Sequence, residues 1–162
     1  MRRTSAPLLF GLAVLGGAAG WLLQVALAST GTAVLIPPIG TSTVLLVIAI
    51  AVLLVALPVR RSVRARGDAA RRHPVDPFYA MRALMLAKAS SILGAFTLGM
   101  GLSLVGYAFS RTGDVETPAF WPSVLLAVGA LAMLVAGLIA ESWCRIPPED
   151  PARPDRAGAS VP

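Results

Sequence analysis

The amino-acid sequence predicts an all-α fold in which four transmembrane helices form a bundle. Four long apolar runs indicate this fold, and none of them contains Asp, Glu, Lys or Arg. Only 14% of the 162 residues are charged, whereas about a quarter are charged in typical soluble domains. A third observation is that the basic residues gather on one side of the predicted membrane. The predicted spans cover residues 7–28, 43–59, 89–109 and 120–140.

The length of each run suits a helix that crosses or nearly crosses a bilayer. At about 1.5 Å per residue, ~20 helical residues cover the ~30 Å of a hydrocarbon core. A segment surrounded by lipid must satisfy its own backbone hydrogen bonds, and a helix does so. We therefore predict one membrane domain, residues 1–145, followed by a tail, 146–162. Five prolines and few large apolar residues predict that this tail is disordered.

The first apolar run also has features of a secretory signal peptide. Met1-Arg2-Arg3 precedes it, and Ala26-Leu27-Ala28 resembles a cleavage site of the A-x-A kind. The run exceeds the usual 7–15 residues or so of a signal-peptide apolar region, which favours an uncleaved span. Both alternatives leave the remaining topology unchanged.

The distribution of basic residues predicts the topology. Every basic residue except Arg111 falls on one side, so the positive-inside rule places both termini and loop 60–73 in the cytoplasm. We interpret this Arg-rich loop as a topology determinant in contact with anionic lipid headgroups; regulation by lipid is an alternative. No aromatic residues interleave its arginines, which argues against nucleic acid. The arginines are Arg60, Arg61, Arg64, Arg66, Arg71 and Arg72.

The third helix is predicted to be longer than a membrane requires. Residues 78–109 would extend about 48 Å as a helix, which gives the helix an extended cytoplasmic base. This base carries Arg82 and Lys88, and Glu141 ends the fourth span at the same predicted level. We expect Glu141 to pair with Lys88 or Arg82 as a clamp at the cytoplasmic interface, with a substrate site as the alternative. Gln24 is expected to hydrogen-bond a neighbouring helix or to reach the outer interface.

Small residues recur every four positions in three of the spans. Residues four apart share a helix face, and small ones let two backbones approach closely. These rows predict packing within the bundle; a homo-oligomer face and chance in an Ala- and Gly-rich chain are the alternatives. The predicted faces comprise Ala13, Gly16, Gly17, Gly20, Ser91, Ala95, Gly99, Ser103, Ala132 and Ala136.

The sequence offers no constellation of catalytic residues. No carboxylate lies in any span, whereas proton-coupled transporters usually need one. His73 and Cys144 are the only residues of their kinds, which is too few for a structural zinc site. No Gly-rich phosphate-binding loop is present. We therefore expect a protein that is not an enzyme and that has no cofactor, metal or catalytic site.

Two segments resemble those of a known family. The stretch from Asp76-Pro77-Phe78-Tyr79 to Lys88-Ala89-Ser90, and Cys144-Arg145-Ile146-Pro147-Pro148 after the last span, are similar to segments of domain of unknown function 3180. The likeness covers about residues 5–148. It implies a four-span protein of an actinobacterial membrane family, and it assigns no chemistry.

Together these observations predict a multi-pass protein of the bacterial plasma membrane. We expect a non-enzymatic accessory or scaffold protein that binds another membrane protein or itself through its small-residue faces. Its expected partners also include the bilayer and its anionic headgroups, but not nucleic acid. The alternative is a small oligomeric transporter subunit for a neutral or anionic metabolite, whose polar pathway would lie between copies.

Overall fold

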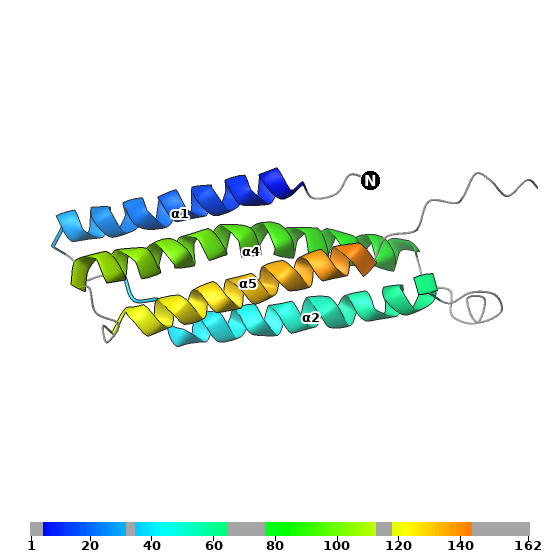
Figure 1. The fold of residues 1–162 in the computed structure, drawn as a ribbon. Helices are drawn as coiled ribbons and strands as arrows, with labels where there is room; N and C mark the ends of the chain where they lie inside the picture. The colour runs from blue at the N-terminus through cyan, green and yellow to red at the C-terminus, as the bar shows by residue number, and fades with distance from the viewer. Residues whose placement is uncertain (1–4, 32–34, 65–76, 113–117, 144–162) are drawn as a thin grey trace, which may run out of the picture.

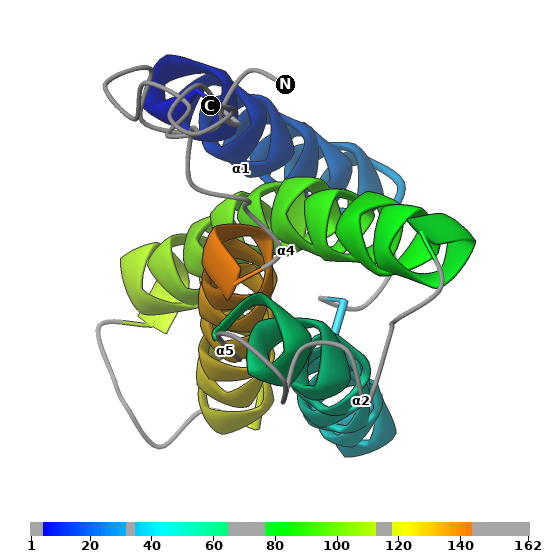
Figure 2. The same ribbon diagram turned by 90° about the vertical axis from the view of Figure 1, so that its right-hand side faces the viewer.

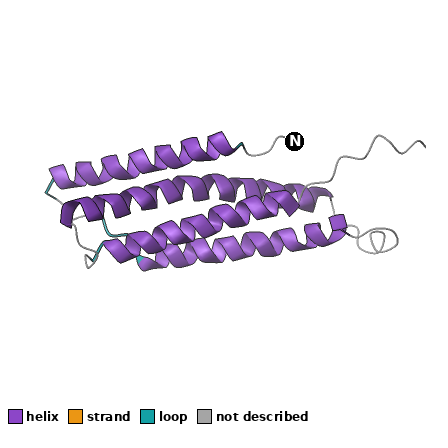
Figure 3. Cartoon of the chain, viewed as in Figure 1, coloured by secondary structure: helices purple, strands orange, loops and turns teal. Residues whose placement is uncertain are grey.

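Four helices make up the part of the chain that the structure, a computed structural model, describes: residues 5–31, 35–64, 77–112 and 118–143. Figure 1 shows α1 (Ala6–Ser29), α2 (Ile39–Arg64), α4 (Pro77–Thr112) and α5 (Phe120–Trp143) side by side along one direction. Within those residues every regular element is a helix (Figure 3). The predicted disordered tail lies outside the described residues.

Each helix is long and apolar enough to cross a membrane. The apolar stretches are Ala6–Ser29 in α1, Ile39–Arg60 in α2, Met81–Arg111 in α4 and Phe120–Trp143 in α5. The prediction of an all-α protein with four transmembrane helices is confirmed, and the chain is a multi-pass membrane protein. The third predicted helix is the longest, with 36 residues.

The helix bounds differ from the predicted spans chiefly in α2. This helix begins at Ile39, directly after Pro37 and Pro38, and not near Thr43. Proline suits the start of a helix because the first N–H groups have no partner within it. Pro58 does not end α2, which continues to Arg64.

The helix α4 lies at the centre of the arrangement. It packs against α1 on one side and against α5 and α2 on the other, as the end-on view shows (Figure 2). Chain neighbours α1 and α2 share no comparable contact, and α1 docks mainly on α4. In α1 only 17% of the membrane-spanning window is buried, against 50% in α5. The fold is therefore a three-helix core with α1 attached to one face.

Small and medium apolar side chains fill the core between α2, α4 and α5. One cluster lies toward the end where α4 finishes, and a second lies toward the end where α4 begins. The first comprises Leu45, Ala49, Leu104, Leu126, Ala130, Met133 and Ala136. The second comprises Val52, Ala56, Ala87 and Ala140.

Glycines bring α4 and α5 into backbone contact. A Cβ added at Gly94 would lie 2.7 Å from the backbone nitrogen of Leu134. A Cβ added at Gly137 would lie 2.7 Å from the backbone nitrogen of Ser91, on the facing helix. Neither position has room for a larger residue without separation of the two helices.

The contact between α1 and α4 is closer still and is reciprocal. A Cβ at Gly16 of α1 would overlap the carbonyl oxygen of Phe96, and a Cβ at Gly99 of α4 would overlap that of Ala13. A Cβ at Gly20 would overlap the hydroxyl of Ser103. These two helices run parallel, and each places a glycine against the backbone of the other.

The predicted small-residue faces occupy different environments in the fold. Gly16, Gly20, Gly99 and Ser103 lie at the α1–α4 contact, and a Cβ at Gly17 would stay 3.5 Å from the Gly99 carbonyl oxygen. Ser91, Ala95 and Ala136 are buried, and Ala132 is half-buried. The spacing did not single out Gly101 and Gly137, although both are packed against a facing backbone.

The C-terminal end of α1 is formed by two side-chain hydroxyl groups and a glycine. Ser29 Oγ donates to the Ala26 carbonyl at 2.7 Å, and Thr30 Oγ1 donates to the Leu27 carbonyl at 2.9 Å. Gly31 follows with φ +70°, a left-handed conformation that favours glycine. The two hydroxyls add donors to carbonyls of the last turn, where helical N–H groups run out.

We predict that Gly99→Ala destabilises the protein by about 1–3 kcal/mol, because the added methyl must separate α1 from α4. The matched control is Gly106→Ala on the same helix, where a Cβ meets nothing within 4 Å. This control should be neutral or stabilising by up to about 1 kcal/mol, because alanine favours the helix. Unfolding in mild detergent measures both, and equal effects of the two changes would contradict the role of Gly99.

Candidate functional site

Polar side chains buried among the described residues hydrogen-bond mostly to backbone. Ser90 and Ser91 each donate to a carbonyl of α4 at 2.9 Å, and Ser123 donates to the carbonyl of Ala119, directly before α5, at 2.7 Å. Among the described side chains, the Ser42 hydroxyl of α2 is buried without a hydrogen-bond partner. These hydroxyls are separate groups within helix contacts, and they do not form a continuous polar path.

Gln24 fastens the end of α1 to the start of the next segment. Its Nε2 donates to the carbonyl of Leu35 at 3.2 Å, and its Oε1 accepts from the backbone N–H of Leu35 at 3.3 Å. The side chain is 1% exposed. Sequence reasoning expected a hydrogen-bonding role for Gln24, and the partner proves to be the backbone ahead of α2.

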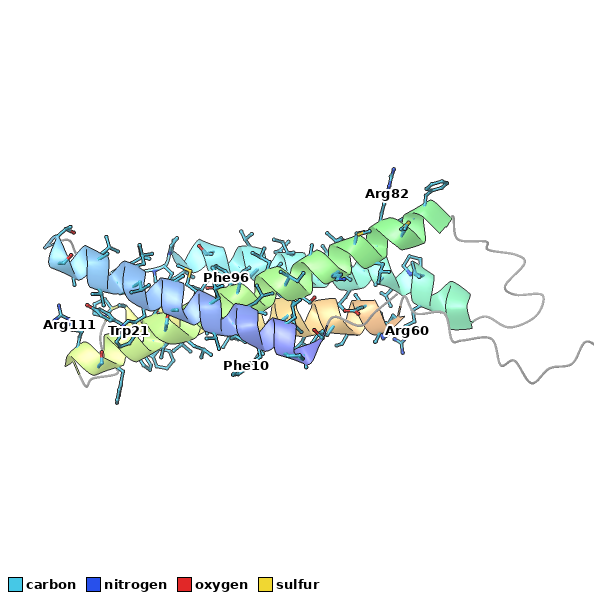
Figure 4. The ribbon with its side chains drawn as sticks, turned by 90° about the horizontal axis from the view of Figure 1, so that it is seen from above. Phe10, Trp21, Arg60, Arg82, Phe96 and Arg111 are labelled. Atoms are coloured by element: carbon cyan, nitrogen blue, oxygen red, sulfur yellow. The ribbon has the colours of Figure 1, made fainter. Side chains whose placement is uncertain are left out.

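Aromatic residues join α1 and α4 near the far end of the molecule. The rings of Trp21 and Tyr107 meet edge to face, with centroids 5.4 Å apart. The Arg111 guanidinium carbon lies 5.9 Å from the centroid of the Tyr107 ring. Figure 4 shows Trp21 and Arg111 at this end and Arg60 at the other. These ring contacts add to the glycine contact between α1 and α4, which by itself covers only a small part of α1.

The opposite end is the basal end, at which α1 and α4 begin and α2 and α5 finish. Here the guanidinium carbon of Arg60 lies 4.3 Å from the centroid of the Trp143 ring and joins α2 to α5. The predicted lipid-contacting arginine therefore already has an aromatic partner. Arg61 and Arg64 belong to α2, but their side chains are outside the description, as are Arg66, Arg71 and Arg72 altogether.

Tyr79, at the base of α4, contacts α2 beside Pro58. Its hydroxyl donates to the Val55 carbonyl at 3.2 Å. Pro58 lacks the N–H that would bond the Leu54 carbonyl, and its ring also bends the turn that contains Val55. The phenol thus supplies a donor from a neighbouring helix next to the carbonyl that Pro58 leaves without its helical N–H.

The expected pairing of Glu141 with Lys88 or Arg82 stays a prediction, and the structure gives the exposure of the three side chains. Glu141 is 8% exposed, while Lys88 and Arg82 are exposed. The geometry of α4 explains this difference. Ala87 and Ser91 face Gly137 of α5, and Lys88 lies about 100° around the helix from Ala87.

Two other expectations concern metal and catalytic groups. Within the described ranges no group of three or more His, Cys, Asp or Glu side chains comes together to hold a metal ion. His73 and Cys144 lie outside those ranges. The absence of a cofactor or a reaction stays a prediction from the sequence.

The first turns of α4 carry an open groove of about 500 Å³ at the basal end. We call this open feature the basal groove. Its lining is apolar except for one arginine. The lining residues are Phe78, Met81, Arg82, Met85, Leu86 and Ala89.

We expect Gln24→Leu to destabilise the protein by about 1–3 kcal/mol, because the N–H and carbonyl of Leu35 lose their partner. Gln24→Glu should cost more, because its buried carboxylate keeps the acceptor, loses the donor and has no counter-charge. Unfolding in detergent should rank the wild type first, then Gln24→Leu, then Gln24→Glu. A Leu variant as stable as the wild type would contradict the fastening role.

Tyr79→Phe should cost about 0.5–1.5 kcal/mol, the usual net value of a hydrogen bond. If the phenol compensates for the bend at Pro58, the cost should shrink when Pro58→Leu removes that bend. A double-mutant cycle on the unfolding free energy measures this coupling. Additive effects of the two changes would show that the phenol and the proline act independently.

Comparison with known proteins identifies the family. The model of the family described as protein of unknown function (DUF3180) matches residues 9–148. No curated protein and no solved structure matches the chain significantly. The matched residues take in all four helices except the first turn of α1. The chain therefore belongs to the DUF3180 family of proteins of unknown function.

Proposed function

We propose that this protein is a non-enzymatic accessory or scaffold protein of the bacterial plasma membrane. It binds another membrane protein or a second copy of itself, and its basal end faces the cytoplasm. The observation that carries this proposal is the outward face of α1, which has no partner helix within the described structure.

The outward face of α1 lies opposite its contact with α4. Gly16 and Gly20 face α4, and Gly11, Leu15, Ala18 and Leu22 lie on the other side of the helix and are exposed. Figure 4 shows Phe10 of α1 pointing away from the other helices. A Cβ at Gly11 would meet nothing within 4 Å.

An open glycine inside a helix needs a physical reason. Glycine costs about 1 kcal/mol relative to alanine in a helix. The glycines at 16, 20 and 99 offset this cost because they let two helices touch. Gly11 has no such compensation within one copy, and neither has Gly106 of α4. Gly11 differs in that it lies on the least buried helix, where the backbone of another helix can approach closely along an uncovered face.

The packed core supports this proposal over transport by one copy. Alanine, leucine and methionine fill the contacts of α2, α4 and α5. The buried serines of α4 and α5 donate to backbone carbonyls and offer a solute little to bind. The second candidate, a small oligomeric transporter for a neutral or anionic metabolite, would need its pathway between copies.

The test is Gly11→Leu in the full chain, tagged and expressed at native level. After extraction in mild detergent, mass spectrometry identifies the copurifying proteins and the mass of the complex. We expect the variant to fold normally, because Gly11 has open space, and to lose most of its partner or second copy. Gly106→Leu is the control, since Gly106 is also open but lies on α4.

Partner retention unaffected by Gly11→Leu would overturn docking on α1. A homo-oligomer that moves metabolites in proteoliposomes would replace the accessory function with the transporter.

A further inference from the structure

The basal groove continues the face of α4 on which α1 docks. Phe96, against which Gly16 packs, follows Phe78 of the groove by 18 residues. This separation is about five helical turns, so the two residues lie on the same side of α4. Met85 and Ser103 have the same relation, as do Ala89 and Tyr107.

Helix α1 covers only the second part of this face. Gly16 lies level with Phe96, and α1 begins ten residues earlier, at Ala6, so its start lies level with about residue 86 of α4. Figure 4 shows α1 crossing α4, while the end of α4 that carries Arg82 extends beyond it. The groove is thus the uncovered continuation of an established helix contact.

The lining of the basal groove combines large apolar groups with one charge. Phe78 is 75% exposed, Met85 61% and Met81 48%. Arg82 lies among them and makes no hydrogen bond or ion pair with any described residue. Arg82 is the second residue of the stretch of α4 that is long and apolar enough to cross a membrane, Met81–Arg111.

The charges at this end favour an anionic occupant. Arg2 and Arg3 precede α1, so a fold-back of that segment onto the groove would set like charges against Arg82. An apolar helix from a partner would cover the methionines but leave the guanidinium without a counter-charge. An anionic phospholipid supplies both an acyl chain and a phosphate, which pairs well with arginine.

We propose that the basal groove binds one anionic phospholipid. Its acyl chain lies along Phe78, Met85 and Ala89, and its phosphate accepts hydrogen bonds from the Arg82 guanidinium. The site differs from the Arg-rich loop in that one arginine and an apolar surface act together. It is also independent of the α1 face, because the two surfaces belong to different helices.

Native mass spectrometry of the full-length protein tests this site. The protein is reconstituted into vesicles of phosphatidylcholine with or without phosphatidylglycerol, extracted in mild detergent, and scored for retained lipid. We expect one phosphatidylglycerol to be retained in preference to phosphatidylcholine. Arg82→Gln should lower its retention about five-fold, the effect of ~1 kcal/mol for one basic side chain at a membrane surface.

Two further variants distinguish a specific lipid site from general electrostatic attraction. Lys88→Gln removes an exposed charge from the same helix outside the groove, and it should leave retention unchanged. Met85→Gln keeps every charge but makes the groove polar, and it should lower retention. Thermal unfolding should be the same for all three variants, because each side chain is exposed.

Equal losses in Arg82→Gln and Lys88→Gln would overturn the site in favour of general electrostatic attraction. No loss in Met85→Gln, or full displacement of the lipid by soluble glycerol phosphate, would show that only a phosphate binds and would overturn the acyl-chain contact. A protein subunit found over Phe78 and Met85 by cross-linking, with no retained lipid, would also overturn the proposal.

Discussion

The close approach of other helices to α4 is the constraint on which the rest of the structure depends. Lipid tails are as apolar as leucine side chains, so helices in a membrane gain little from apolar burial alone and associate through short-range packing. Dispersion weakens quickly with separation, which makes contact at backbone distance valuable. On α4, Gly99 provides such contact with α1, and Gly94 and Gly101 provide it with α5 on the opposite side. The central helix α4 thereby holds α1 and α5 through separate contacts on its two sides.

The glycine contacts lie in the middle of the helices, and the polar and aromatic contacts between described elements lie toward the ends. Gln24 binds the backbone of Leu35 and Trp21 meets Tyr107 at one end. Arg60 lies over Trp143 at the other. This division follows from the solvent, because a polar group in hydrocarbon must be fully satisfied, whereas near the headgroups water can complete its hydrogen bonds. The glycines therefore set the helix spacing, and the terminal contacts limit how far the ends separate.

The sequence was sufficient for the helices, because a run without charges and long enough to cross hydrocarbon has few other structures open to it. It was less informative about contacts. The four-residue spacing of small residues identified Gly16 and Gly99 as contact positions, but it did not identify Gly101 and Gly137. Crossing helices touch in one region, and not along a whole row of residues on one helix face. Depth in the membrane, which the sequence indicates, does not fix rotation about the helix axis. In α4 that rotation is set by Ala87 and Ser91, which pack against Gly137.

The same packing that stabilises α1 also creates the uncovered face at the basal end. Gly16 against Phe96 and Trp21 against Tyr107 fix how far α1 is shifted along α4. With that shift fixed, the 24 residues of α1 cannot cover the 36 of α4. At about 1.5 Å per residue the excess is ~18 Å, and most of it lies where α4 begins. Phe78, Met81 and Met85 are exposed there, at the start of the stretch of α4 that is apolar enough to cross a membrane. An apolar face ending in one arginine is therefore a direct consequence of how the two parallel helices are held together.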